Sequence, residues 1–528
     1  MGRKIIIAAA FILLLSLVAK PIWDSREQWH WGQGMDDGVY WVTAKALAMG
    51  EGYRVVSLPG APRAVKFPPL YPLYLSLAWR IDPEFPGNLK TAATLQALLL
   101  PVYLALLLAL LRQLGFSWRR TFLVAALTAV TFQFTLSAAM LFSELLCGCF
   151  LLAAFLAIER SVSEAGSRAR WWAAGGSVLT GLAYLTRNAA LPFLIAIPVF
   201  LLIRKRRELI PYALLAAVPM ALAWHVWVFL YSGTSADPVN ASYLSEYLQI
   251  IRVHGFWHNL MQQASVLSGS IAENFFPGAI QLSLGLPLIH LVLIAAIAGA
   301  IRIGRKQKWP LCIIFTGLYL GLIVVWWSEG LGRLVLPVWP ILLAGIAQEA
   351  DHFASLCAKS MSTKSMTAAK SAMWKQVPRW ALIALCVAII ARSDSATWLR
   401  MYSVMADERK SRLQDQVAYS WVAEHATLDS VVVTWKDSVS YLYTGLPSSH
   451  GLYLAVTPQR PDFKAVQASF SALPPQYQCG LLLLLRSDFG DAFQGSQLDS
   501  LRASAERLDG SKLEYSSSDA LIYRFTFR

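Results

Sequence analysis

Long apolar stretches, separated by short polar or basic loops, make up most of the chain before about residue 392. A bilayer hydrocarbon core of about 30 Å needs roughly 20 apolar residues in one helix. Several of the stretches reach that length, and others fall a little short. The pattern predicts about eleven membrane-spanning helices, at residues 5–18, 94–111, 122–138, 141–158, 172–185, 189–203, 212–231, 279–301, 311–327, 334–346 and 380–391. We therefore expect a polytopic α-helical membrane protein.

Lysines and arginines gather in the short loops between these stretches, at residues 119–120, 168–170, 204–207, 302–308 and 359–379. Cytoplasmic loops carry such an excess of basic residues. An inside N-terminus, indicated by Arg3 and Lys4, places every one of these loops on the inner side. The net charge of +14 then reflects topology rather than nucleic-acid binding. The first stretch continues into Lys20-Pro21 without a small-residue cleavage site, which favours an uncleaved span over a signal peptide.

Two long segments lie outside the membrane in this arrangement, at residues 19–90 and 232–277. The apolar stretch 70–79 within the first segment is too short to span. It predicts an interfacial or re-entrant helix, with Tyr71, Tyr74 and Trp79 at the depth of the lipid headgroups.

The composition changes at about residue 392. Residues 405–424 have apolar positions at helical spacing, and residues 498–508 also suggest a helix. Residues 430–435 and 481–485 are typical of buried strands, while 521–527 alternates as an edge strand does. We expect a transmembrane domain over 1–391 and a small extracytoplasmic α/β domain over 392–528. The latter has no glycine-rich phosphate loop and no assigned cofactor.

Adjacent carboxylates follow the first span, at Asp36 and Asp37. Carboxylates beside a bilayer are unfavourable to desolvate, so such groups usually have an ion-pair partner or a functional role. Glu144 lies at the outer start of the fourth span, and Arg187 and Arg333 lie in outer turns, against the positive-inside bias. Arginine suits bidentate phosphate recognition, and a carboxylate can accept a proton from a hydroxyl. Together they indicate an outer cavity that binds a phosphate and activates a hydroxyl.

Each of these residues also has a structural interpretation. Asp36 and Asp37 could cap a helix over residues 38–47. Glu144 could pair with Arg187 for structure alone, and Arg187 and Arg333 could anchor helix ends at the interface.

Lys66 and two histidines also have both a functional and a structural interpretation. Lys66, just before a Pro-Pro turn, fits either an interface anchor or a phosphate ligand. His254 and His258 have the i, i+4 spacing of metal ligands, but without an obvious third ligand we interpret them as loop histidines.

Several motifs resemble the C-type (GT-C) membrane glycosyltransferases, in particular the protein O-mannosyltransferase, lipid A aminoarabinose transferase and RgtA-like branches. Residues 36–41 (DDGVYW) are similar to their Asp-Glu-x-x-Tyr signature, with Asp37 where the relatives usually have Glu. The other similar segments are 44–53 (AKALAMGEGY, a helix and Gly-x-Gly-Tyr turn), 66–73 (KFPPLYPL), 143–144 (SE), 185–187 (LTR) and 333–340 (RLVLPVWP). The resemblance covers about residues 1–350.

This resemblance implies an inverting transfer of one sugar from a polyprenyl monophosphate to an acceptor hydroxyl of a lipid, glycan or protein. Asp36 would be the base, and Asp37 and Glu144 would support it. The substrate-binding residues would be Lys66, Tyr71, Arg187 and Arg333, with the arginines on the donor phosphate.

Two further expectations go with this resemblance, and two interpretations compete with it. Some branches use a divalent metal and others do not, so a metal is possible and no cofactor is certain. The expected location is the bacterial inner membrane, with the N-terminus in the cytoplasm. The competing interpretations are a transporter or flippase of lipid-linked or polar substrates, and a structural protein whose outer domain is the active part.

Overall fold

The structure is a computed structural model, and it describes residues 2–28, 31–32, 36–233, 237–275, 285–326, 332–362, 399, 402–450, 456–457, 460–461, 463, 467, 473, 475–489 and 493–526. The chain divides into two compact units, which are described separately. The helical unit comprises Met1–Asp24, Gln96–Ala223 and Tyr247–Met401, and the mixed unit comprises Ser25–Leu95, Trp224–Glu246 and Tyr402–Arg528.

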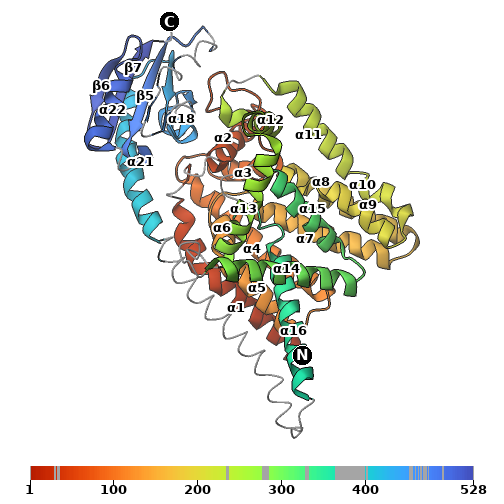
Figure 1. The fold of residues 1–528 in the computed structure, drawn as a ribbon. Helices are drawn as coiled ribbons and strands as arrows, with labels where there is room; N and C mark the ends of the chain where they lie inside the picture. Colours follow the sequence, from red (N-terminus) through yellow and green to blue (C-terminus); the bar gives the residue numbers. More distant parts are fainter. Residues whose placement is uncertain are drawn as a thin grey trace. The chain divides into compact units, whose positions relative to one another are not determined.

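Apolar helices build the helical unit (Figure 1). They are α1 (Gly2–Asp24), α4 (Asn88–Gln113), α5 (Trp118–Val130), α6 (Phe132–Ala139), α7 (Glu144–Ser163), α8 (Gly166–Thr186), α9 (Phe193–Ile203), α10 (Ile210–Leu214), α11 (Ala217–Tyr231), α12 (Tyr243–His254), α13 (Phe256–Phe275), α14 (Gly285–Lys306), α15 (Leu311–Val325) and α16 (Trp339–Ser362). Along the chain, α4, α11 and α12 each continue across a boundary between the units. Glycines allow α14 and α16 to cross closely, since a Cβ on Gly299 would lie 1.9 Å from the carbonyl oxygen of Gly345.

Three described helices are long and apolar enough to cross a membrane: Lys4–Glu27, Asn88–Gln113 and Glu144–Ser163. The bent pairs Trp118–Val130 with Phe132–Ala139 and Arg207–Leu214 with Ala217–Tyr231 raise the number to five if each is one span. Shorter apolar helices cover Asn188–Ile203 and Leu311–Val325. The predicted count of eleven is therefore not confirmed over the described residues. The predicted span 380–391 lies outside them.

The span predicted over residues 122–138 is interrupted by a bend of 66° between α5 and α6. Thr131 is extended at the break, with φ −61° and ψ 129°. Its hydroxyl donates to the carbonyl of Leu127 and accepts from the indole N–H of Trp339, at 2.7 and 2.9 Å. These bonds satisfy polar groups at the break, as bent membrane helices require.

The mixed unit contains a five-stranded sheet of order β2-β1-β5-β7-β6 (Figure 1). The strands are β1 (Ser430–Val433), β2 (Ser448–Ser449), β5 (Cys479–Leu485), β6 (Lys512–Ser516) and β7 (Ala520–Thr526), and β3 (Val456–Thr457) pairs separately with β4 (Arg460–Pro461). β1 is parallel to β2 and β5, whereas β7 is antiparallel to β5 and β6.

Helices flank this sheet in sequence and cover part of it. They are α18 (Asp437–Thr444), α21 (Arg486–Phe489), α22 (Gly495–Ala505) and a helix over residues 402–425. The core joins Val433 and Leu484 of the sheet to Leu501 of α22.

The predicted strands at 430–435 and 481–485 and the predicted helices at 405–424 and 498–508 are present, with shifted ends. The prediction that 521–527 is an edge strand is wrong, because β7 pairs on both sides. Leu521, Ile522 and Tyr523 are all buried, as a central strand requires. The edge strand beside β7 is β6, whose residues are mostly exposed, and β2 forms the other edge of the sheet.

The mixed unit also holds α2 (Asp36–Ala48) and α3 (Leu70–Ile81), which pack against each other. The helix predicted at 70–79 is thus present as α3. The side chains of Tyr71 and Trp79 are buried within the unit, and their predicted depth at the lipid headgroups stays a prediction. Tyr71 packs edge-on against Tyr40 at 5.0 Å between ring centroids, and Trp79 packs against Trp41 at 4.9 Å.

Candidate functional site

Three of the predicted site residues meet in the helical unit. Glu144 Oε1 lies 2.9 Å from Arg187 Nη1 and 2.8 Å from Arg333 Nε. The Glu144 side chain is 3% exposed, and those of Arg187 and Arg333 are 13% and 24% exposed. Two guanidinium groups around one carboxylate leave a formal charge of +1. We call these three residues the Glu144 cluster.

The ends of two helices place Glu144 and Arg187. Glu144 is the first residue of α7, where a carboxylate also interacts favourably with the positive end of the helix dipole. Arg187 ends α8 in an extended conformation, and its N–H donates to the carbonyl of Ala183 at 3.0 Å. Its guanidinium also donates to the hydroxyl of Ser143 at 2.9 Å. The structural pairing of Glu144 with Arg187 that the sequence suggested is therefore present.

Hydrogen bonds anchor the turn that carries Arg333. The side chain of Asn274 donates to the carbonyl of Gly332 at 3.0 Å, and the phenol of Tyr319 donates to the carbonyl of Leu334 at 2.7 Å. The Arg333 guanidinium lies over the ring of Phe142, 4.2 Å from its centroid. Because these partners fix the turn, the Arg333 charge is directed at Glu144 rather than into solvent.

A cavity adjoins the Glu144 cluster. Aromatic and aliphatic residues form most of its wall, and Glu144 and Ser137 supply polar groups; the other lining residues are Tyr103, Phe134, Leu145, Gly148, Leu336 and Pro337. An apolar cavity with a few polar groups is the usual character of a small-molecule site. Of the Glu144 cluster, Glu144 itself lines this mostly apolar cavity, and the paired guanidinium groups of Arg187 and Arg333 lie on its carboxylate.

Asp36 and Asp37 are the first two residues of α2 in the mixed unit, so they lie inside the helix rather than capping one that begins at residue 38. Asp37 is 1% exposed. Its two carboxylate oxygens accept hydrogen bonds from the backbone N–H groups of Gly32 and Gly38, at 2.9 and 3.0 Å. Asp36 is only partly buried. Asp37 therefore holds the backbone at Gly32 and Gly38, while Asp36 is the more accessible carboxylate of the pair.

The predicted Gly-x-Gly-Tyr turn follows α2. Gly50 and Gly52 have φ of +77° and +81°, a conformation that favours glycine. The phenol of Tyr53 donates to the carbonyl of Phe67 at 2.8 Å, which ties this turn to the Pro-Pro segment. Lys66 in that segment forms an ion pair of 2.7 Å with Glu246.

Of the other predicted substrate-binding residues, Tyr71 is 0% exposed in its aromatic cluster. A direct contact of Tyr71 with substrate therefore has no support in the structure. Asp36, Asp37, Lys66 and Tyr71 belong to the mixed unit, and Glu144, Arg187 and Arg333 belong to the helical unit.

The C-terminal part of the chain packs directly on the loop that carries Asp36, which the sequence did not indicate. A Cβ on Gly32 would lie 2.2 Å from Val439 Cγ2, and one on Gly38 would lie 3.0 Å from Ser438 Cβ. The Arg412 guanidinium donates to the carbonyl of Trp31. These contacts join α18 and the 402–425 helix to the start of α2.

Buried carboxylates extend this junction. Asp437 accepts from the hydroxyl of Ser57 at 2.9 Å, and Asp237 accepts from the hydroxyl of Ser449 at 2.8 Å. Burial raises the pKa of Asp437 to about 6 and also raises the pKa of Asp237. Burial lowers the pKa of His450, whose ring lies 3.7 Å from Asp437.

A second buried group joins the 402–425 helix to the sheet. Lys436 Nζ lies 2.9 Å from Asp488 and 3.6 Å from Asp415. Burial raises the pKa of Asp415 to about 6, although Lys436 opposes the shift. The segment Lys436-Asp437 directly follows a buried strand, which is the one sequence signal that could have identified these groups.

The stability of this junction is expected to fall as pH rises from about 4 to about 7. A folded-state pKa near 6 against about 3.9 in the unfolded chain means that the folded state binds the proton more tightly. For Asp437 alone the loss between pH 5 and pH 8 is about 1 kcal/mol. Hydrogen exchange of α18 and β1 in wild type and Asp437→Asn at both pH values measures it. Equal pH dependence in the two proteins would contradict this assignment.

Among the residues that the structure describes, no group of three or more His, Cys, Asp or Glu side chains could hold a metal ion. The rings of His254 and His258 stack 6.3 Å apart.

No family model matches the sequence, and no curated protein sequence matches it. Solved structures do match over nearly the whole chain. ArnT from Cupriavidus metallidurans in the apo state gives a TM-score of 0.51 at 15% identity, with 98% of each chain covered. The same protein bound to undecaprenyl phosphate gives 0.50 at 13% identity, with 97% of each chain covered.

An archaeal protein matches as well. The oligosaccharyltransferase AglB from Archaeoglobus fulgidus, in complex with an inhibitory peptide and a dolichol-phosphate, gives a TM-score of 0.51 at 12% identity. The match covers 99% of this chain and 74% of AglB. The chain therefore has the fold of the GT-C membrane glycosyltransferases, as its motifs predicted. It is an integral membrane protein, mostly helical, with a small sheet near the C-terminus.

Proposed function

We propose that this chain is a membrane glycosyltransferase that transfers one sugar from a polyprenyl-phosphate donor to an acceptor hydroxyl. The observation that carries the proposal is the likeness in fold, over 97% of each chain, to an ArnT structure that contains undecaprenyl phosphate. The Glu144 cluster has two guanidinium groups on one carboxylate, and this net positive charge suits the phosphate of such a donor. The basic loops favour an inside N-terminus, and the resemblance to bacterial families favours the bacterial inner membrane, with that N-terminus in the cytoplasm.

In the proposed reaction Asp36 accepts the proton of the acceptor hydroxyl. The acceptor oxygen forms a bond to the anomeric carbon as the bond from that carbon to the phosphate oxygen breaks. Attack from the opposite face inverts the anomeric configuration. Arg187 and Arg333 stabilise the negative charge that develops on the departing polyprenyl phosphate. Glu144 positions both arginines, because each lies within 3 Å of its carboxylate.

A direct assay tests this proposal against a transporter or flippase. Purified full-length protein in nanodiscs is given a panel of radiolabelled polyprenyl-phosphate sugars together with lipid, glycan and peptide acceptors. Release of polyprenyl phosphate with labelled acceptor is the expected result. Donor movement across the bilayer of proteoliposomes without bond cleavage would instead identify a flippase.

Lys66 provides a separate test of the donor site. If its ammonium group contacts the donor phosphate, Lys66→Met should raise the donor KM about tenfold, the loss of one charge-assisted contact. Glu246→Gln removes the partner of the ion pair and is the matched control. A partly exposed ion pair contributes about 0–1 kcal/mol to stability. Equal KM changes in the two variants would assign Lys66 to structure.

A further inference from the structure

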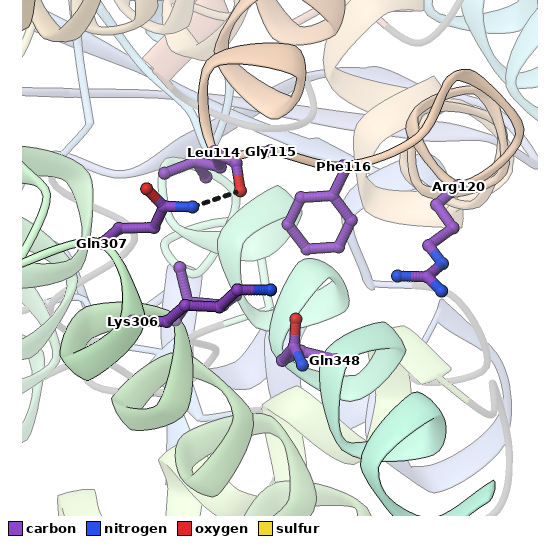
Figure 2. Close-up of a pocket in the computed structure, with 8 residues that line it drawn as sticks. Leu114, Gly115, Phe116, Arg120, Lys306, Gln307 and Gln348 are labelled. Carbon is purple, nitrogen blue, oxygen red and sulfur yellow. Dashed lines mark hydrogen bonds between the residues drawn. The ribbon is translucent and has the colours of Figure 1, made fainter. Parts of the chain in front are cut away.

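A polar pocket lies in the helical unit, away from the Glu144 cluster in sequence and in its lining residues. The turn between α4 and α5, the end of α14 and the middle of α16 form it, and the lining residues are Leu114, Gly115, Phe116, Arg120, Ile303, Lys306, Gln307 and Gln348. Figure 2 shows Arg120 and Lys306 extending toward the space between Phe116 and Gln348. Two cations and two side-chain amides thus line one pocket, whose wall also includes apolar groups.

The charges of this pocket are not balanced within the described residues. Arg120 forms an ion pair with Asp351 of α16. Lys306 is exposed, and no carboxylate of the described ranges is within salt-bridge distance of its ammonium group. The nearby Arg302 is already paired with Glu349, at 2.6 Å. The pocket therefore has a net positive charge, and its one lysine is available to an anion.

The backbone around the pocket is fixed. The Gln307 amide donates to the carbonyl of Leu114 at 3.3 Å (Figure 2). Gly115 has a φ of +78°, and a Cβ there would lie 3.1 Å from Gln307 Nε2. Arg112 donates to the carbonyl of Phe116 and lies 4.9 Å from the centroid of the Trp118 ring. The cations are therefore held around a built pocket rather than on a loose loop.

We propose that this pocket binds the phosphate headgroup of an anionic phospholipid. The ammonium of Lys306 and the guanidinium of Arg120 would contact the phosphate, and the Gln348 amide would donate to its oxygens or to the headgroup hydroxyls. Leu114, Phe116 and Ile303 would contact the glycerol backbone. Basic pockets at the ends of membrane helices suit such headgroups. The site is independent of the proposed sugar transfer, since none of its residues belongs to the Glu144 cluster or to α2.

A lipid is favoured over a free phosphate because of where the pocket lies. It sits at the end of α4, which is long and apolar enough to span a membrane. Its polar side chains lie beside an apolar wall. The basic residues at 119–120 and 302–308 that surround it also belong to the loops that the positive-inside rule places at an anionic leaflet.

Native mass spectrometry of the full chain tests the proposal. Wild type is titrated with phosphatidylglycerol and with phosphatidylcholine, and we expect retention of the first alone. Arg120→Gln/Lys306→Gln should weaken phosphatidylglycerol binding about thirtyfold, as expected for two cations near a membrane surface. Arg119→Gln/Lys308→Gln is the matched control, because it removes the same charge from neighbouring positions that do not line the pocket. Equal retention by wild type and both double variants would overturn the proposal.

Two further measurements keep the result independent of folding defects. Asp351→Asn frees Arg120 from its ion pair and should strengthen phosphatidylglycerol binding severalfold, an effect that a damaged fold would not produce. Inorganic phosphate, matched against sodium chloride, should neither displace the lipid nor raise the thermal unfolding temperature. Stabilisation by phosphate alone, with no added effect of the lipid, would identify a soluble phosphate as the ligand and contradict the lipid proposal.

Discussion

Replacing Asp36 by asparagine is expected to lower the rate constant of sugar transfer by two to four orders of magnitude, the usual contribution of a general base. Asparagine keeps the size of the side chain and its place at the start of α2 but cannot accept the proton. The KM for the donor should change little, because the arginines and not Asp36 are proposed to bind its phosphate. Release of polyprenyl phosphate under donor saturation measures the effect.

Asp37→Asn is the matched comparison for Asp36. The carboxylate of Asp37 is buried and accepts two backbone hydrogen bonds, so its loss should lower stability by about 1–3 kcal/mol. The transfer rate of the remaining folded protein should fall less than in Asp36→Asn. If Asp36→Asn retained full activity and Asp37→Asn lost it, the base would have to be reassigned to Asp37.

Arg333→Gln is expected to reduce kcat/KM for the donor at least a hundredfold, comparable to the loss of one preorganised donor at a developing anion. Arg333→Lys keeps the charge but not the planar fork of donors, so it should recover only part of the activity. Steady-state kinetics with varied donor concentration measures both variants, and thermal unfolding separates activity from folding.

A suitable control for Arg333 lies in the same unit. Arg204 is 20% exposed and forms an ion pair with Glu159, which is 10% exposed. Arg204→Gln should therefore lower stability to a similar degree and leave kcat/KM of the folded protein unchanged. If both substitutions reduced transfer equally, the Glu144 cluster would have a structural role only.

The hydrophobic pattern predicted where most helices lie, because apolar length and helix ends are local properties of the sequence. The start of α7 at Glu144 and the start of α2 at Asp36 agree with their acidic first turns. The bend at Thr131 was not predicted, since residues 122–138 were interpreted as one continuous span. At the bend, Thr131 accepts a hydrogen bond from Trp339, a residue more than two hundred positions away.

Part of the candidate site was predictable, because the ends of helices are also local properties of the sequence. The pairing of Glu144 with Arg187 could be inferred because both lie at the same ends of neighbouring predicted spans. The buried Asp37 and Tyr71 could not be told from surface residues, since their environment depends on distant segments. The contacts of Ser57 with Asp437 and of Asp237 with Ser449 join positions separated by more than two hundred residues, with no local signal.

The interlocking of α18 with the loop around Gly32 and Gly38 has a consequence for protein engineering. Val439 and Ser438 occupy the space that side chains at those glycines would need. Chimeras that graft a foreign C-terminal region onto this chain would therefore meet mismatched surfaces, unless residues 25–95 and 224–246 are exchanged together with residues 402–528. The transplantable module is discontinuous in sequence, and swapping experiments that follow the linear boundary near residue 391 would divide it.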